Sequence, residues 1–322
     1  MNKIALLVLY NHRYDKNIPK IEKFYQGKFS HIFHLMPFYE GERQNVIPVY
    51  ESSYQFQSYI AQALKFLKLN NINGGGQYSH YFIVADDMLL NPSITEWNLF
   101  DKLGLSDDSC FITNIREQHL QKFEVFPLLY SIEKQGVEVK NILPRYNEAV
   151  RKFEYYGLET SRVKPRLLLR LIMTSIFFAI RGLFNINEMA YWTRKLAIQI
   201  IFAFGNRKLK YPLVGGWSDI LIITDEVMPK FCTYCGAFAA TNLFVEFAIP
   251  TALVLSSNKI TLGKQLRLKG LFLKRREKEI SVGRAEIKEV FDSKYNYCIK
   301  ELLNDFPQDT LFIHPIKLSE WK

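Results

Sequence analysis

The 322-residue chain has few of the features that mark secreted proteins. It contains only four cysteines, Cys110, Cys232, Cys235 and Cys298, and it starts with a strand-like apolar run rather than a secretory leader, so we expect a reducing, cytoplasmic environment. Cys232 and Cys235 form a lone Cys-x-x-Cys pair. Because a structural zinc site needs four ligands, we do not expect the pair to bind metal.

Long apolar runs are also lacking. The longest, from Leu167 to Phe184, contains an uncharged decapeptide at 171–180, and a second run covers 196–204. Crossing a bilayer takes about 20 apolar residues, so we expect no transmembrane helix. The triplet Gly74–Gly76 lacks the Gly-x-Gly-x-x-Gly order and opens no helix, which argues against a glycine-rich phosphate-binding loop.

Acidic residues are scarce in one window. The chain carries a net charge of +10, and residues 160–218 account for +9 of it because Glu188 is their single acid. The basic residues of this window are Arg162, Lys164, Arg166, Arg170, Arg181, Arg194, Lys195, Arg207, Lys208 and Lys210. Such a block needs an anionic partner: phospholipid, a phosphorylated substrate or nucleic acid.

The basic window alternates with apolar runs and contains Tyr191 and Trp192. This pattern fits helices that lie in the interface of an anionic membrane, and the alternative is a helical hairpin packed on the core with its basic edge in water. We expect no nucleic-acid partner, because the interleaved residues are apolar and no RNA or DNA motif is present. A second basic cluster at 264–278 indicates a solvated face or an extension of the membrane-facing surface.

Apolar periodicity predicts alternating strands and helices. Expected strands cover 3–10, 31–38, 45–50, 80–85, 109–114, 220–223 and 311–314; expected helices cover 18–25, 54–67, 94–103, 241–253 and 295–303. This order predicts an α/β fold with a Rossmann-type, mostly parallel sheet and flanking helices. The basic amphipathic segment at 159–212 would be inserted between 1–158 and 213–322, which complete one catalytic domain.

The apolar strand at 80–85 ends abruptly in Asp86 and Asp87. Adjacent carboxylates at the end of a buried strand repel each other unless a cation or hydrogen bonds compensate, which favours a divalent metal. The alternative is that both residues only form the next turn.

Two further carboxylates stand out. Asp219 follows Gly215-Gly216-Trp217, and small residues with an aromatic ring and a carboxylate are typical of a sugar site. Glu246 stands alone in an apolar helix, where it either reaches into a cleft as a base or sugar ligand, or extends to water.

These elements resemble GT-A nucleotide-sugar glycosyltransferases, whose Asp-x-Asp motif binds Mn²⁺ or Mg²⁺ on the nucleotide diphosphate. Asp86-Asp87 lacks the spacer of that motif. The ending His314-Pro315-Ile316-Lys317 with Trp321 resembles the His-x-Gly-x-x-Lys-Pro-Trp terminus of glycogenin-like enzymes, without its glycine. Residues 215–219 and 244–246 are similar to segments of transferases that build bacterial O-antigen or capsule.

The resemblance implies site roles. Asp86, Asp87 and His314 would hold the metal, and Lys317 a phosphate. Tyr10 and Asn11, at the end of the first strand, would contact the nucleotide base. An oxygen-rich site with one imidazole suits Mn²⁺ or Mg²⁺ better than zinc.

The sequence therefore predicts an enzyme, a metal-dependent hexosyltransferase on the inner face of the cell membrane. It would move a sugar, with galactose as the first guess, from a UDP-sugar donor to a lipid-linked or lipopolysaccharide glycan acceptor. Asp219 would bind sugar hydroxyls, and Glu246 would act as the base if the reaction inverts configuration. The alternative is a non-catalytic membrane adaptor with a degenerate α/β scaffold.

Overall fold

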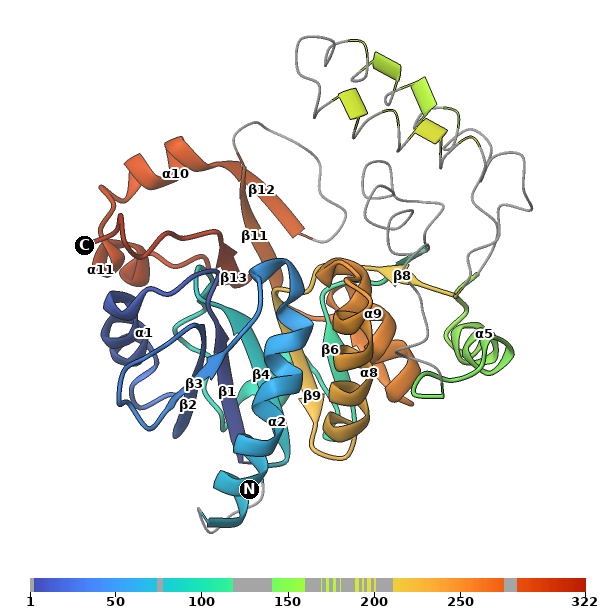
Figure 1. The fold of residues 1–322 in the computed structure, drawn as a ribbon. Coiled ribbons are helices and arrows are strands. Elements are labelled where there is room, and N and C mark those ends of the chain that lie inside the picture. The colour runs from blue at the N-terminus through green and yellow to red at the C-terminus, as the bar shows by residue number, and fades with distance from the viewer. Residues whose placement is uncertain are drawn as a thin grey trace.

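The computed structural model describes residues 3–73, 78–117, 141–159, 211–274 and 283–322, with single residues and pairs between 169 and 200. They form an α/β fold in which helices cover a mixed, mostly parallel sheet (Figure 1). The expected α/β class is confirmed at this level. The glycine triplet at 74–76 and most of the basic segment at 160–210 lie outside the described residues.

The main sheet has seven strands in the described chain. From one edge to the other they are β3 (Val46–Val49), β2 (His31–Pro37), β1 (Ile4–Leu9), β4 (His80–Ala85), β9 (Ile220–Thr224), β6 (Cys110–Ile112) and β10 (Ile260–Leu262). β9 runs antiparallel to both of its neighbours, and the other pairs are parallel. The amino end of β9 therefore lies at the same edge of the sheet as the carboxyl ends of the parallel strands. We call this edge of the sheet the carboxyl edge.

The central strands are buried on both faces. Every residue of β1 is at most 1% exposed, and alternate side chains enter two separate cores. Strands buried on both faces are apolar throughout, which is why β1 and β4 are predictable from sequence. One face is covered by α2 (Phe56–Asn73), α8 (Met228–Ala240) and α9 (Val245–Ser256), with α5 (Tyr146–Tyr155) against α9 (Figure 1).

A second, smaller sheet helps to cover the opposite face. Its strands are β12 (Gly283–Ile287), β11 (Lys269–Lys274), β13 (Thr310–His314) and β5 (Leu89–Leu90). The same core contains residues of α1 (Ile18–Tyr25), α3 (Leu99–Leu103), α10 (Lys288–Lys294) and α11 (Ile299–Asn304). Because β5 follows the acid pair and pairs with β13, this sheet brings the end of the chain to the carboxyl edge.

The remaining elements are short. β7 (Arg116–Glu117) and β8 (Val214–Gly215) form an antiparallel ribbon, and single 3-10 turns cover Asp15–Asn17, Ser53–Gln55 and Gly263–Gln265. Residues 1–158 and 213–322 both contribute strands to the main sheet. Among the residues described, no helix has both the length and the apolar character needed to cross a membrane.

Several sequence predictions of elements are wrong in detail. The helix expected at 94–103 is confined to α3, and the one expected at 295–303 is replaced by α10 and α11. Between those two helices Asn296 and Tyr297 have φ of 50° and 54°, which no α-helix accommodates. In the described part of the basic cluster at 264–278, up to residue 274, Lys264 and Arg267 are exposed, whereas the β11 residues Leu271, Phe272 and Leu273 are at most 3% exposed.

Candidate functional site

The carboxyl edge contains a point where the strand order reverses. From β1 the chain continues outward to β2 and β3, and β4 then lies on the other side of β1. In doubly wound sheets ligands bind outside the carboxyl ends at such a point. Here Asn11 follows β1 and Asp86 follows β4, and the Asn11 backbone N and Nδ2 donate to Asp86 Oδ1 at 3.3 and 3.4 Å.

Asp86 is a carboxylate that the fold leaves poorly compensated. The residue is 6% exposed, and burial raises the pKa of its carboxyl to about 7, with a further contribution from Asp87. The two long hydrogen bonds from Asn11 oppose this shift only in part. A cation beside Asp86 would restore its ionised form.

Asp87 lies close to His314, although the two residues are far apart in the sequence. His314 Nε2 lies 3.2 Å from Asp87 Oδ1, and the Ile316 backbone N donates to Asp87 O at 2.6 Å. Burial lowers the pKa of His314, but the nearby Asp87 carboxylate outweighs it and raises the pKa to about 9. The structure thus brings together three of the predicted site residues: Asp86, Asp87 and His314.

Asp219 joins the same cluster from β9. It precedes the strand directly, and its backbone O accepts from Ala85 N at 3.0 Å. Burial raises the pKa of its carboxyl, while His314 and Lys274 act in the opposite sense. Asp86, Asp87, Asp219 and His314, which we call the acid cluster, therefore share one electrostatic environment with the Lys274 ammonium.

The side chains of the acid cluster are of types that bind divalent cations, but they do not supply a complete set of metal ligands. Within the described ranges, no group of three or more His, Cys, Asp or Glu side chains is arranged to hold a metal. Asp87 Oδ1 is buried and, apart from His314 Nε2 at 3.2 Å, has no partner within the described chain. Mg²⁺ is commonly bound by one or two carboxylates together with phosphate oxygens of a substrate, so these residues suit a cation that arrives with its ligand.

Tyr10 cannot serve in this structure as the predicted stacking partner of a base. Its residue is 0% exposed, and its hydroxyl lies 2.9 Å from His34 Nδ1. Phe38 and Tyr50, 58% and 63% exposed, are aromatic residues that follow β2 and β3, and their rings meet edge to face at 6.0 Å. Phe38 has a φ of 51°, an unusual conformation for a bulky residue that clusters at functional sites.

Lys317 does not contact the acid cluster in the described structure. Its side chain is 59% exposed, and its ammonium lies 3.6 Å from Glu320. That Lys317 holds a phosphate stays a prediction. Lys274, which the sequence did not single out, is the ammonium that acts on both Asp219 and His314.

Glu246 lies in the first turn of α9, half-buried, close to the turn before β9. Its backbone O accepts from Gly216 N at 2.9 Å. A Cβ at Gly216 would lie 2.2 Å from Asn114 O, so this glycine is required by the close approach of the chain itself.

Sequence reasoning also missed Asn114 and Arg116, which follow β6. Asn114 Oδ1 accepts from the Trp217 backbone N at 2.9 Å, and the Arg116 guanidinium lies 5.8 Å from the Trp217 ring centre. Asn114 comes two residues after β6, a buried strand that ends at the carboxyl edge, and this is the same kind of signal that identifies Asp86. Arg116 lies in β7, and no comparable signal marks it.

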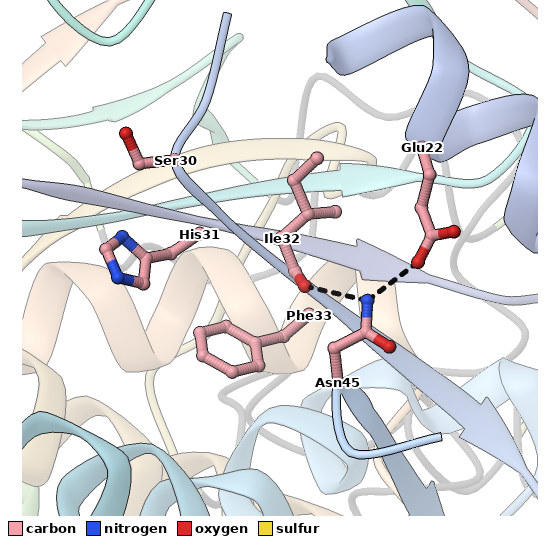
Figure 2. A pocket seen from close by; sticks show the side chains of 6 residues that line it. All are labelled: Glu22, Ser30, His31, Ile32, Phe33 and Asn45. Carbon is pink, nitrogen blue, oxygen red and sulfur yellow. Dashed lines mark hydrogen bonds between the residues drawn. The ribbon is translucent and has the colours of Figure 1, made fainter. Parts of the chain in front are cut away.

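Two hollows lie outside this site. One, of about 310 Å³, is lined by Glu22, Ser30, His31, Ile32, Phe33 and Asn45. Figure 2 shows the Asn45 amide donating to Glu22 and to Ile32 O inside it, so its carboxylate is already engaged. The other, of about 630 Å³, lies between α5, α8 and α9 and has Arg145, Lys152 and Lys230 in its lining.

Comparison of the chain with protein families, with curated proteins and with solved structures finds no match. The resemblance to glycosyltransferases thus remains a prediction from motifs. The geometry of the acid cluster and its surroundings is what can support a function.

Proposed function

We propose that the chain is a GT-A-type glycosyltransferase that uses Mn²⁺ or Mg²⁺. It would transfer a hexose, with galactose as the first candidate, from a UDP-sugar to a lipid-linked or lipopolysaccharide glycan. The observation that carries this proposal is the 3.2 Å approach of His314 to Asp87, beside Asp86 at the carboxyl end of β4. An imidazole and two carboxylates at a strand-order reversal support a site for a metal-bound diphosphate.

The chemistry needs positive charge where the leaving group departs. Breaking the bond between sugar and diphosphate leaves negative charge on the phosphate, which a bound divalent cation would stabilise. The sequence hypothesis gives this role to Asp86, Asp87 and His314. Because the described residues show no trio arranged as a metal cage, one or two of them would hold the cation together with diphosphate oxygens. Lys274, rather than Lys317, places an additional ammonium near the same cluster.

The donor nucleotide would lie over the ends of β1 and β2. Asn11 presents its amide there, and the exposed Phe38 and Tyr50 rings offer faces on which a base can stack. Stacking on an aromatic ring contributes about 1–3 kcal/mol per base. Phe38 and Tyr50 thus take the role that the sequence had suggested for Tyr10.

Asp219 and Glu246 would act on the sugars. Asp219 lies within the acid cluster and would accept hydrogen bonds from sugar hydroxyls. If the reaction inverts configuration, Glu246 is the base that takes the acceptor proton. If the reaction retains configuration no such base is needed, and Glu246 would position the sugar.

An assay of UDP release tests the proposal. The full chain is incubated with UDP-galactose or UDP-glucose, with Mn²⁺ or with a chelator. We expect metal-dependent hydrolysis or metal-dependent UDP binding. Absence of both would contradict the transferase proposal and favour the membrane adaptor.

We also propose that the acceptor is met at an anionic membrane surface. The described helical residues Leu169, Met173, Phe177 and Ile180 follow one another at steps of four, four and three, so they lie on one side of a helix. They are 63%, 58%, 59% and 61% exposed. A helix packed on a soluble core normally exposes polar residues, so an apolar exposed side within a segment of net charge +9 supports membrane contact.

Sedimentation with vesicles tests this contact. Binding to vesicles containing anionic lipid should exceed binding to neutral vesicles and should weaken with salt. Replacing Leu169 and Met173 by Ser should lower binding about tenfold, whereas Val290→Ser, at a 65% exposed apolar residue of α10, should not. Equal binding by all these proteins would contradict the membrane proposal.

A further inference from the structure

Hydrogen-bond donors and cations border the acid cluster on its β6 side. We call Arg116, Trp217 and Lys274 the Trp217 group. Lys274, the last residue of β11, has its ammonium 4.8 Å from the ring centre of Trp217. The Arg116 guanidinium lies 5.8 Å from the same ring. Lys274 also acts electrostatically on Asp219 and His314, so this group lies beside the acid cluster.

Two donors in this group have no acceptor. Trp217 Nε1 and Arg116 Nε are buried, and neither donates a hydrogen bond to any residue in the described part of the chain. Leaving a buried donor unpaired costs about 1–3 kcal/mol, so each such group needs an explanation. Two unpaired N–H groups beside an ammonium are the complement of an oxyanion.

The group is held in place by the fold. The Trp217 backbone N donates to Asn114 Oδ1, and its ring packs against Phe272 with centres 5.0 Å apart. Gly216 presses against the Asn114 carbonyl, which fixes the turn that carries Trp217. A rigid donor loses little entropy when it binds, which favours a real binding site over a chance surface contact.

The position of the group in the sheet indicates which substrate it faces. Across the carboxyl edge the order is β1, β4, β9 and β6, so the acid pair lies between Asn11 and the Trp217 group. If the nucleotide lies over β1, as proposed above, the Trp217 group is on the opposite side of the reacting sugar. A transfer reaction needs its acceptor on that side.

We infer that Arg116, Trp217 and Lys274 form a subsite for an anionic group, a phosphate or carboxylate, on the glycan acceptor. This inference rests on the proposed function for its assignment to the acceptor. The oxyanion subsite itself rests on the unpaired donors and the adjacent cations. It predicts that neutral glycans are poorer acceptors than glycans with a phosphate or carboxylate group.

Calorimetric titration with inorganic phosphate tests the subsite, using the full chain with and without UDP and Mg²⁺. We expect phosphate to bind alone and together with UDP. Trp217→Phe keeps the ring and removes its N–H, and should weaken phosphate binding about fivefold. Lys274→Met should weaken it about tenfold. Trp97→Phe, at a 55% exposed tryptophan, should change nothing.

The alternative results are distinguishable. Competition between phosphate and UDP would assign the subsite to the donor diphosphate and overturn the acceptor inference. Failure of phosphate to bind, or equal binding by the Trp217→Phe variant, would overturn the subsite itself. If phosphate binds as expected but UDP does not, the oxyanion site stands while the transferase proposal and the assignment to an acceptor both fail.

Discussion

Two regions of the molecule use carboxylates in different ways. Beside β2, the half-buried Glu22 accepts from Asn45 at 2.8 Å and from Arg43 at 3.0 Å, as Figure 2 shows for Asn45. At the carboxyl edge, Asp86 accepts the two long bonds from Asn11, and Asp87 Oδ1 has the His314 imidazole 3.2 Å away. Glu22 is compensated by several donors and stabilises the fold, whereas the weaker compensation of Asp86 at a strand-order reversal indicates a ligand site.

Two histidines repeat this contrast. His34 is buried against Tyr10, and burial lowers the pKa of its ring to about 4. His314 is also largely enclosed, but the Asp87 carboxylate raises the pKa of its ring to about 9. Burial keeps the His34 ring neutral. The Asp87 carboxylate favours the protonated form of His314, and a cation bound at Asp87 would remove that effect. The contrast predicts that substitutions in the two regions affect different properties.

The largest effect is expected at Asp87. Asp87→Asn removes the charge that pairs with His314 and should lower metal-dependent UDP-sugar hydrolysis about 100-fold or more. Asp305→Asn removes an exposed carboxylate 3.2 Å from Lys294 and should leave the rate unchanged. Steady-state rates with Mn²⁺ check both variants. A fully active Asp87→Asn variant would contradict the functional role given to the carboxylates at the carboxyl edge.

Opposite changes in stability are expected at Asp86 and Glu22. The pKa of Asp86 is raised, so the stability that this group contributes when protonated is lost as the pH rises through about 7. At pH 8 Asp86→Asn should therefore raise the free energy of unfolding by about 1–3 kcal/mol. Glu22→Gln should lower it by about 1 kcal/mol, because it weakens the bonds to Arg43 and Asn45.

Urea denaturation at pH 8 measures these changes. A gain in stability at Asp86, together with weaker Mn²⁺ binding, is the signature of a group kept for function. Loss of stability in both variants would mean that the two regions do not differ in the way proposed.

The two histidines should set the pH range of stability. His34 has a lowered pKa, so the fold loses about 1 kcal/mol per pH unit as the pH falls from 6.5 toward 4. His314 has a raised pKa, so its contribution is complete below 6.5 and is lost as the pH rises through about 9.

Thermal denaturation across this range separates the histidines. His34→Gln should flatten the acid limb of the profile, and His314→Gln the alkaline limb. If either substitution flattens the limb assigned to the other residue, the assignment of the opposite shifts is wrong.

The smallest effect is expected at Phe38. Phe38→Gly removes an exposed ring and relieves a positive φ, so it should weaken UDP binding about fivefold without lowering the melting temperature. Tyr297 also has a positive φ, 54°, and is 38% exposed, so Tyr297→Gly is a matched control that should not affect UDP binding. Equal UDP affinities for the unchanged protein and both variants would show that Phe38 does not contact the nucleotide.

Much of the carboxyl edge was predictable because its strands are buried on both faces. The apolar run at 80–85 and the acid pair after it identify β4 and its end without ambiguity. The apolar run at 311–313 and His314 identify β13, although nothing in the sequence fixes its pairing with β5. That pairing, which brings His314 to Asp87, depends on the second sheet.

Other parts could not be predicted from local patterns. α8 is enclosed by α2 and α9, so it lacks the single apolar stripe that marks a surface helix. In β11, lysines at both ends obscure the buried centre. Tyr10 was misassigned because a residue at a strand end can turn inward, and only the structure reveals its contact with His34. Arg116 and Lys274 meet at Trp217 through long-range packing.

The most direct test of the central claim is to locate the cation. Crystals soaked with UDP and Mn²⁺ should show anomalous scattering from one manganese about 2.2 Å from an Asp87 carboxylate oxygen, with diphosphate oxygens completing its coordination. Manganese bound elsewhere, or UDP bound at the carboxyl edge with no metal between it and Asp87, would contradict the account.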